Sequence, residues 1–223
     1  MNSPERVPAD VCRIHLVRHG RTVMNVSVRF RGRLDVPLDE VGQAEAREAA
    51  SNLRQAPLAA VYTSPLERAK EVAREIAAAS SLAPVTVDDG LTNLDYGRWE
   101  GLTKDECKER DPDAFRLYAE DPMRARCPEG EALADGATRV VSALLGIGKR
   151  HTGQEVAAVT HGAMVRLAVL YVEGVAPGDW QFKLPTGSAT VFEVRDGALS
   201  VVSVADRTTP DPFKASARSA APA

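Results

Sequence analysis

The segment from Leu16 to Asn25, which reads LVRHGRTVMN, places side chains suited to phosphoryl chemistry directly after an apolar run. Arg18 carries a rigid fork of hydrogen-bond donors that matches the geometry of phosphate. His19 carries an imidazole that can act as a nucleophile near neutral pH. Gly20 lacks the side chain that would keep a ligand away from the backbone. Together these residues predict a phosphate cradle with a nucleophile inside it.

A second histidine–glycine pair stands in the same structural context. His161 and Gly162 follow the apolar stretch 156–160, just as His19 follows the first apolar stretch. In open α/β sheets, ligands bind beyond the carboxyl ends of the strands. If the two strands are neighbours, the two histidines face each other across one pocket. A lone histidine is usually a core or surface residue, but two such pairs favour a functional site.

Arg68 is a third candidate cation. The segment 64–67 (Ser-Pro-Leu-Glu) predicts the start of a helix, with a capping box and a proline at the first helical position. Arg68 then lies in the first turn, where a cation opposes the helix dipole at a cost of about 0.3–1 kcal/mol. A surface arginine paired with Glu71 or Glu75 is the plain alternative. Because the chain holds other candidate phosphate ligands, contact with phosphate is favoured.

Alternating strand and helix patterns indicate how these residues are positioned. Strands are expected at 11–17, 58–62, 85–87, 155–160, 188–194 and 198–204. Helices are expected at 39–55, 64–80, 131–150 and 162–171. The polar stretch 102–130 predicts an inserted lid. This order predicts an α/β fold, a three-layer α/β/α sandwich with a mostly parallel central sheet and a small lid insert.

Composition limits the class of protein. The chain has 223 residues, of which 44% are hydrophobic, and this suits one domain with a sizeable core. A net charge of -3 argues against nucleic acid and membrane partners. Three cysteines without metal-like spacing indicate a cytoplasmic protein with reduced thiols. Residues 1–10, which lack a signal-peptide core, and residues 206–223 are expected to be disordered, which leaves one domain at 11–205.

The ordered set of motifs resembles the histidine phosphatase superfamily, in its phosphoglycerate mutase-like branch. The matching pieces are 16–25, 29–32, 35–38, 63–69, 91–101, 130–131 with Asp135, and 159–162. They occur in the family's order and span most of residues 12–195. One such piece would be a weak signal, whereas the ordered set is specific.

The resemblance implies a mechanism and its residues. His19 would attack phosphorus and become phosphohistidine, and water would then release phosphate. The catalytic side chains Arg18, Arg68 and His161 would hold the phosphoryl oxygens. Asn25 and Gly162 match substrate-binding positions near the phosphate. The resemblance implies no metal and no cofactor, since arginines neutralise the charge that magnesium handles elsewhere.

Asn93 departs from the family, which usually has a glutamate there that protonates the leaving group. An amide has no titratable proton in the useful range. Asp95 or Glu100 could supply the proton instead, although both match other common family positions. The substrate could have a good leaving group, as an acyl phosphate or a phosphoramidate does. The pocket could also bind phosphate but turn it over slowly, or do another reaction.

The family also differs from this chain in charge near the predicted cradle. Arg21 replaces a usual glutamate or glutamine, and further departures are Arg33, Ala163 and Thr186. From position 18 onward, five arginines, at positions 18, 21, 29, 31 and 33, come before the next acid, Asp35. A solvated basic loop is the plain interpretation. The alternative is a pocket mouth for a polyanionic substrate, with Arg21 and Arg31 as binding residues.

Three functions are compatible with these features. The favoured one is a phosphatase for a small phosphorylated metabolite. Phosphoglycerate mutase-type transfer is less favoured, because residues 102–129 are short beside the mutase insert and the acid is missing. A repurposed or weakly catalytic phosphate-binding protein is the third. The sequence decides neither the substrate nor the oligomeric state, for which a homodimer is an option.

Overall fold

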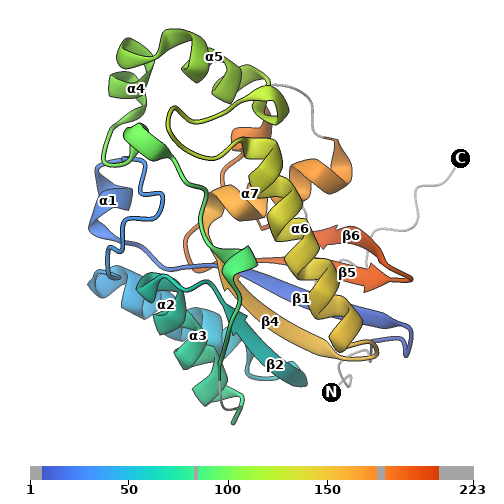
Figure 1. The fold of residues 1–223 in the computed structure, drawn as a ribbon. Helices are drawn as coiled ribbons and strands as arrows, with labels where there is room; N and C mark the ends of the chain where they lie inside the picture. The colour runs from blue at the N-terminus through green and yellow to red at the C-terminus, as the bar shows by residue number, and fades with distance from the viewer. Residues whose placement is uncertain (1–6, 83–84, 175–178, 206–223) are drawn as a thin grey trace, which may run out of the picture.

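The computed structural model describes residues 7–82, 85–174 and 179–205. The expected tail at 206–223 and most of the expected N-terminal extension lie outside these ranges. A six-stranded sheet with the strand order β3-β2-β4-β1-β5-β6 forms the centre (Figure 1). Its strands are β1 Val11–Arg18, β2 Leu58–Thr63, β3 Thr86–Val87, β4 Glu155–Thr160, β5 Ala189–Arg195 and β6 Ala198–Ser203.

The first four strands are parallel, and the C-terminal hairpin is antiparallel to β1. The hairpin turns at Asp196 and Gly197, which both have positive φ, at 51° and 77°. Positive φ at both central residues is the requirement of a type I′ turn. The predicted sheet, mostly parallel with a terminal hairpin, is confirmed.

Helices cover both faces of the sheet, as predicted. They are α1 Val23–Val26, α2 Glu40–Leu53, α3 Glu67–Ala79, α4 Lys104–Arg110, α5 Pro112–Glu120, α6 Leu133–Arg150 and α7 Gly162–Glu173. Helices α2 and α3 pack on one face, and α6 and α7 on the other (Figure 1).

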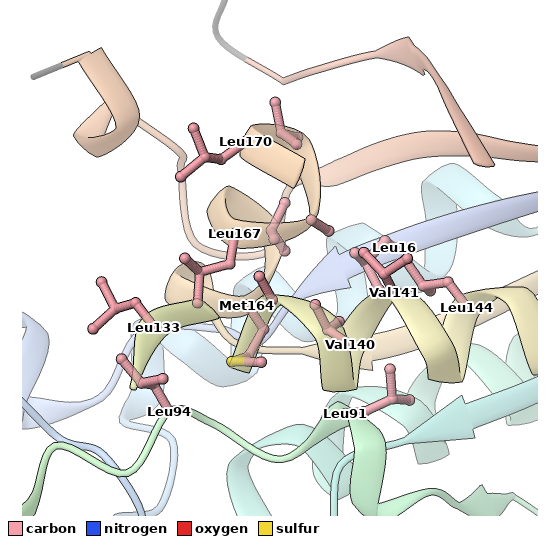
Figure 2. Packing of buried hydrophobic residues seen from close by; sticks show 14 of the residues in the cluster. Leu16, Leu91, Leu94, Leu133, Val140, Val141, Leu144, Met164, Leu167 and Leu170 are labelled. Carbon is pink, nitrogen blue, oxygen red and sulfur yellow. The ribbon is translucent and has the colours of Figure 1, made fainter. Parts of the chain in front are cut away.

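The alternation of side chains along β1 divides the core between these faces. Leu16 is fully buried in the cluster on the α6 and α7 side, which also includes Val140 and Met164 (Figure 2). Val17, the next residue, belongs to the cluster under α2 and α3. Because both faces of β1 are buried, its carboxyl end is held rigidly between two hydrophobic layers.

The polar stretch expected to form a lid folds into α4, α5 and the short 3-10 helix Pro122–Arg124. Its inner side chains join the core, because Cys107, Tyr118 and Cys127 are buried. Trp180 donates its indole N–H to the Tyr118 carbonyl at 2.8 Å and packs edge-on to the Tyr118 ring. The insert therefore forms a packed wall above the carboxyl end of the sheet.

The predicted capping box at 64–67 is wrong. Helix α3 begins at Glu67, and its N-cap is Leu66, which makes no side-chain cap. Pro65 therefore precedes the helix instead of filling its first position. The Ser64 hydroxyl lies against a histidine of the site described below. A tertiary contact has thus taken the side chain that the local pattern assigned to capping.

Candidate active site

His19 lies directly after β1 and is fully buried. Its Nδ1 lies 2.6 Å from the Gly20 carbonyl oxygen. Because a carbonyl can only accept, Nδ1 carries the proton and Nε2 carries the lone pair. Nε2 is buried and has no hydrogen-bond partner among the described residues. Burial, followed by the charges of Arg68 and Arg31, holds the pKa of His19 well below its usual value, so the ring is neutral at pH 7.

Gly20 is required by packing against α2. A Cβ at Gly20 would lie 2.3 Å from the carbonyl oxygen of Gly42, which is closer than real side-chain contacts. Gly42 in turn lies against the backbone of Arg21. The sequence interpretation assigned Gly20 to ligand approach, whereas the structure shows two backbones in close contact at this point. This contact fixes the turn that presents His19.

His161 lies directly after β4, the parallel neighbour of β1. Arg18 pairs with Thr160 in the register of these strands, so the two histidines follow at the same level. Their ring centroids are 5.1 Å apart. His161 Nε2 lies 2.7 Å from the Ser64 hydroxyl, and Nδ1 is buried without a partner among the described residues. Burial and the charge of Arg68 hold the pKa of His161 well below its usual value.

Arg18 and Arg68 lie near the two histidines, and each donates hydrogen bonds to backbone carbonyls. One Arg68 NH group donates to Leu34 at 2.6 Å and the other to Gly32 at 2.9 Å. Arg18 donates to the Leu184 carbonyl. In both arginines Nε is buried and has no partner within the described ranges. Arg68 is fully buried, so the alternative of a surface ion pair for it is wrong.

The positively charged arginine side chains of the site repel one another. Burial, followed by the charge of Arg31, lowers the pKa of Arg18 to about 9 and that of Arg68 to about 10. Arg31 also lowers the pKa values of both histidines. Arg18, Arg31 and Arg68 form no ion pair with a carboxylate in the part of the chain that the structure describes. A dianion bound among them would relieve this repulsion.

A pocket of about 270 Å³ opens next to these groups. The residues lining it include Arg18, Asn25, Arg31, Asn93, Tyr96, Lys104, Tyr118, His161, Gly162 and Arg166. His19 and Arg68 are not themselves among the lining residues, and the site extends to them through His161, which lines the pocket. Among the described residues that line it there is no aspartate or glutamate.

Of the basic residues predicted to line the pocket mouth, only some do so. Arg21, predicted as a binding residue, pairs with Asp39 at 2.8 Å and does not line the pocket. Arg33 pairs with Asp95 at 3.4 Å. Arg31 lines the pocket as predicted. Local sequence could not show that carboxylates from other segments neutralise Arg21 and Arg33.

Two pocket cations, Arg166 and Lys104, were missed by the sequence analysis. A Cβ at Gly162 would lie 3.1 Å from Arg18 Nε and 3.2 Å from one Arg166 NH group, so these guanidinium groups flank the start of α7. The signal for Arg166 was its place one helical turn after the pair His161 and Gly162. Lys104 comes from α4, and no local pattern indicated it.

Asn25 and Asn93 present amide groups to the pocket. The Asn25 Oδ1 accepts from the Thr22 backbone and hydroxyl, both at 2.9 Å, which leaves its amino group for the pocket. Asn93 is 4% exposed and donates from Nδ2 to the Gly32 carbonyl at 3.0 Å. Its Oδ1 is buried and has no partner in the described structure.

Asp95 and Glu100, the two carboxylates that could replace the missing acid, are bound to groups of the surrounding loops. Neither side chain lines the pocket. Asp95 accepts from the Gly97 N–H at 2.9 Å and pairs with Arg33. Glu100 accepts from the Arg33 N–H at 2.8 Å. Both carboxylates therefore serve the surrounding loops.

Arg139 on α6 holds the loop that carries Asn93, and the sequence analysis did not identify it. It donates to the carbonyls of Thr92 at 2.8 Å and Gly90 at 3.0 Å. Glu131 accepts two hydrogen bonds from the same guanidinium, at 3.0 and 2.9 Å. A rigid bidentate pair of this kind fixes both the arginine and the loop.

Metal ligands, free cysteines and membrane-spanning helices are three further properties of the described residues. Among the described residues, no group of three or more His, Cys, Asp or Glu side chains could hold a metal ion. The cysteines at positions 12, 107 and 127 are buried and free. The described helices include none that is long and apolar enough to cross a membrane.

Comparison with known proteins gives consistent matches. Residues 14–207 match the profile of the Histidine phosphatase superfamily (branch 1). The chain is 34% identical over 182 residues to phosphoserine phosphatase 1 of Hydrogenobacter thermophilus, covering 81% of this chain and 86% of that protein. It is 32% identical over 190 residues to phosphoglycerate mutase-like protein 4 of Arabidopsis thaliana, covering 84% and 82%. The structure of Bacillus stearothermophilus YhfR superposes with a TM-score of 0.78 at 32% identity, covering 86% and 96%.

Proposed function

The chain belongs to the histidine phosphatase superfamily, branch 1, and is a phosphatase; on that premise we propose that it hydrolyses a small phosphorylated metabolite through a phosphohistidine on His19. The observation that carries this proposal is the state of His19. Its ring is neutral, its Nδ1–H is bound to Gly20, and its Nε2 lone pair is buried among cations. A nucleophile held in this way needs no base to activate it.

The transferred phosphoryl group would lie between the two histidines. The unpartnered Nε groups of Arg18 and Arg68, together with His161 Nδ1, supply buried donors for its oxygens. The amino group of Asn25 supplies another. These donors are in place before the reaction, so charge that develops on the phosphoryl oxygens is stabilised without reorganisation. Water then attacks the phosphohistidine and releases phosphate.

We infer that the leaving group departs without a carboxylic acid, because position 93 holds an amide and the carboxylates of Asp95 and Glu100 are bound to groups of the surrounding loops. The two tyrosines of the lining hold their protons tightly. Burial raises the pKa of Tyr96 to about 12 and raises that of Tyr118 well above its usual value. His161 is neutral. Substrates with a good leaving group are therefore preferred.

The outer part of the pocket favours a leaving group that carries negative charge. Arg31, Arg166 and Lys104 line it. Arg166 and Arg31 form no ion pair within the described ranges, whereas Arg29, which also lines the pocket, is paired with Glu106 at 2.9 Å. This excess of positive charge would bind and steer a dianionic or polyanionic metabolite.

Trapping of the phosphoenzyme tests this function. Wild-type protein is mixed with phosphoserine, p-nitrophenyl phosphate or acetyl phosphate and quenched without acid, and the label is mapped by mass spectrometry. We expect phosphate release and a label on His19. His19→Ala should lose both, whereas His151→Ala, at the end of α6 and outside the pocket, should keep both. A label on His161, or full activity of His19→Ala, would contradict the assignment.

A further inference from the structure

The hydrogen-bond polarity of Asn93 is fixed by its surroundings. The Gly32 carbonyl accepts from Asn93 Nδ2 at 3.0 Å and from an Arg68 NH group at 2.9 Å. A carbonyl cannot donate, so the opposite orientation of the amide would place two acceptors in contact. Asn93 therefore turns its Oδ1 away from Gly32, and that oxygen is buried without a partner among the described residues.

The backbone that carries Asn93 is held as firmly as its amide. Arg139 donates to the carbonyl of Thr92 at 2.8 Å and lies 3.4 Å from that of Asn93. The two carboxylate oxygens of Glu131 accept from Nε and from one NH group, which form one edge of the Arg139 guanidinium. The Asn93 side chain cannot easily rotate out of the site, and its Oδ1 and Nδ2 atoms cannot easily exchange places. It presents an uncharged acceptor to whatever enters the pocket.

An acceptor at this position distinguishes between kinds of good leaving group. Buried polar atoms in proteins nearly always have a hydrogen-bond partner, so a ligand that brings a donor suits this oxygen. The bridging oxygen and the carbonyl of an acyl phosphate are acceptors only and would repel Asn93 Oδ1. The bridging nitrogen of an N-phosphorylated amine or guanidine carries hydrogen and can donate. We propose that the substrate is a phosphoramidate whose bridging nitrogen bears hydrogen, an assignment that rests on the proposed function.

The chemistry of such a substrate explains why an amide can replace the acid. A bond forms between His19 Nε2 and phosphorus while the phosphorus–nitrogen bond breaks, and its electron pair goes to nitrogen. In the zwitterionic form the nitrogen already carries the additional proton, so it leaves as a neutral amine. Asn93 Oδ1 accepts from that N–H and stabilises the reactive form. Water then attacks phosphorus, the electron pair returns to Nε2, and dihydrogen phosphate is released.

The test compares three phosphoryl donors, each assayed with the wild-type protein, the variant Asn93→Leu and a control variant. Phosphoramidate has hydrogens on its bridging nitrogen, N-phosphoimidazole has none, and acetyl phosphate bridges through oxygen. In Asn93→Leu, kcat/KM for phosphoramidate should fall by about 10- to 100-fold, as expected for loss of a hydrogen bond to a buried group. Because the variant also loses the bond to Gly32, kcat/KM for the other two donors should fall too, but by at least about tenfold less than for phosphoramidate. The control Asn52→Leu, on the exposed face of α2, should change none of them.

Equal losses on all three donors, or no loss on phosphoramidate, would overturn the substrate assignment. If phosphohistidine still forms on His19, the proposed function stands while this inference fails. If no donor labels His19, the proposed function itself fails. Should Asn93→Leu not fold, the wild-type protein decides the question. Its acceleration over the uncatalysed rate should then be at least about tenfold greater for phosphoramidate than for N-phosphoimidazole, and the reverse order contradicts the proposal.

Discussion

Asn93→Glu restores a titratable proton at the edge of the pocket and should change how the enzyme responds to its leaving group. General acid catalysis is worth about 10²- to 10⁴-fold for a poor leaving group. The substitution also removes the Asn93 bond to Gly32. Gly32 keeps its bond from Arg68, so the loss is limited to one hydrogen bond, which lowers the gain by about tenfold at most. Alkyl phosphates should therefore be cleaved about 10- to 1,000-fold faster.

The assay measures kcat/KM for wild type, Asn93→Glu and Asn93→Gln across aryl and alkyl phosphates of graded leaving-group pKa. Wild type should show a steep dependence on that pKa, because no acid assists departure. Asn93→Glu should flatten the dependence, whereas Asn93→Gln, which matches its length but has no acidic proton, should not. Parallel dependences for wild type and Asn93→Glu, or a flat series in wild type, would refute the reasoning, since another group would then protonate the leaving group.

Four further predictions concern the arginines and histidines. Arg68→Lys should lower kcat/KM by about 10-fold or more with an unchanged circular dichroism spectrum, because a point charge cannot replace the fork; wild-type activity would place Arg68 outside the reaction. Because the pKa of His19 is depressed, a pH–rate profile of kcat/KM should show no protonation step near pH 6.5 beyond that of the substrate phosphate, whose pKa is about 6 and is titrated separately, and an additional step would contradict a neutral buried nucleophile. His19 and His161 take up protons on unfolding but not in the folded state, so the free energy of unfolding should decrease below pH 6.5, by about 1.4 kcal/mol per pH unit for each ring in urea titrations. Arg139→Lys should lower the free energy of unfolding by about 1–3 kcal/mol. In proteins that carry Arg139→Lys, adding Asn93→Glu should no longer raise kcat/KM for alkyl phosphates. An unchanged gain would mean that Arg139 does not position the side chain at residue 93.

Local sequence patterns identified the residues that follow a strand. Arg18, His19 and His161 could be predicted because each ends a buried strand, and parallel neighbouring strands bring such ends together at one edge. Arg68 could be predicted because its charge opposes the dipole of its own helix. In each case the signal lies within a few residues of the side chain concerned.

Contacts between distant segments could not be predicted in this way. Ser64 fits a capping pattern, but His161 of another strand is near enough to bind it instead. Arg21 belongs to the same basic run as Arg31, yet Asp39 of the following helix neutralises it. Lys104 carries no pattern at all and reaches the pocket because α4 packs above the sheet.

The sequence by itself determined the order of strands and helices, the family motifs and the presence of an amide at Asn93. These follow from residue type, spacing and local backbone preference. Only the tertiary structure decided which charges remain unpaired and which end of the Asn93 amide faces the pocket. The physical reason is that a charge is neutralised, or an amide oriented, by the nearest partner in space. For Asn93 that partner is the Gly32 carbonyl, which is 61 positions away along the chain.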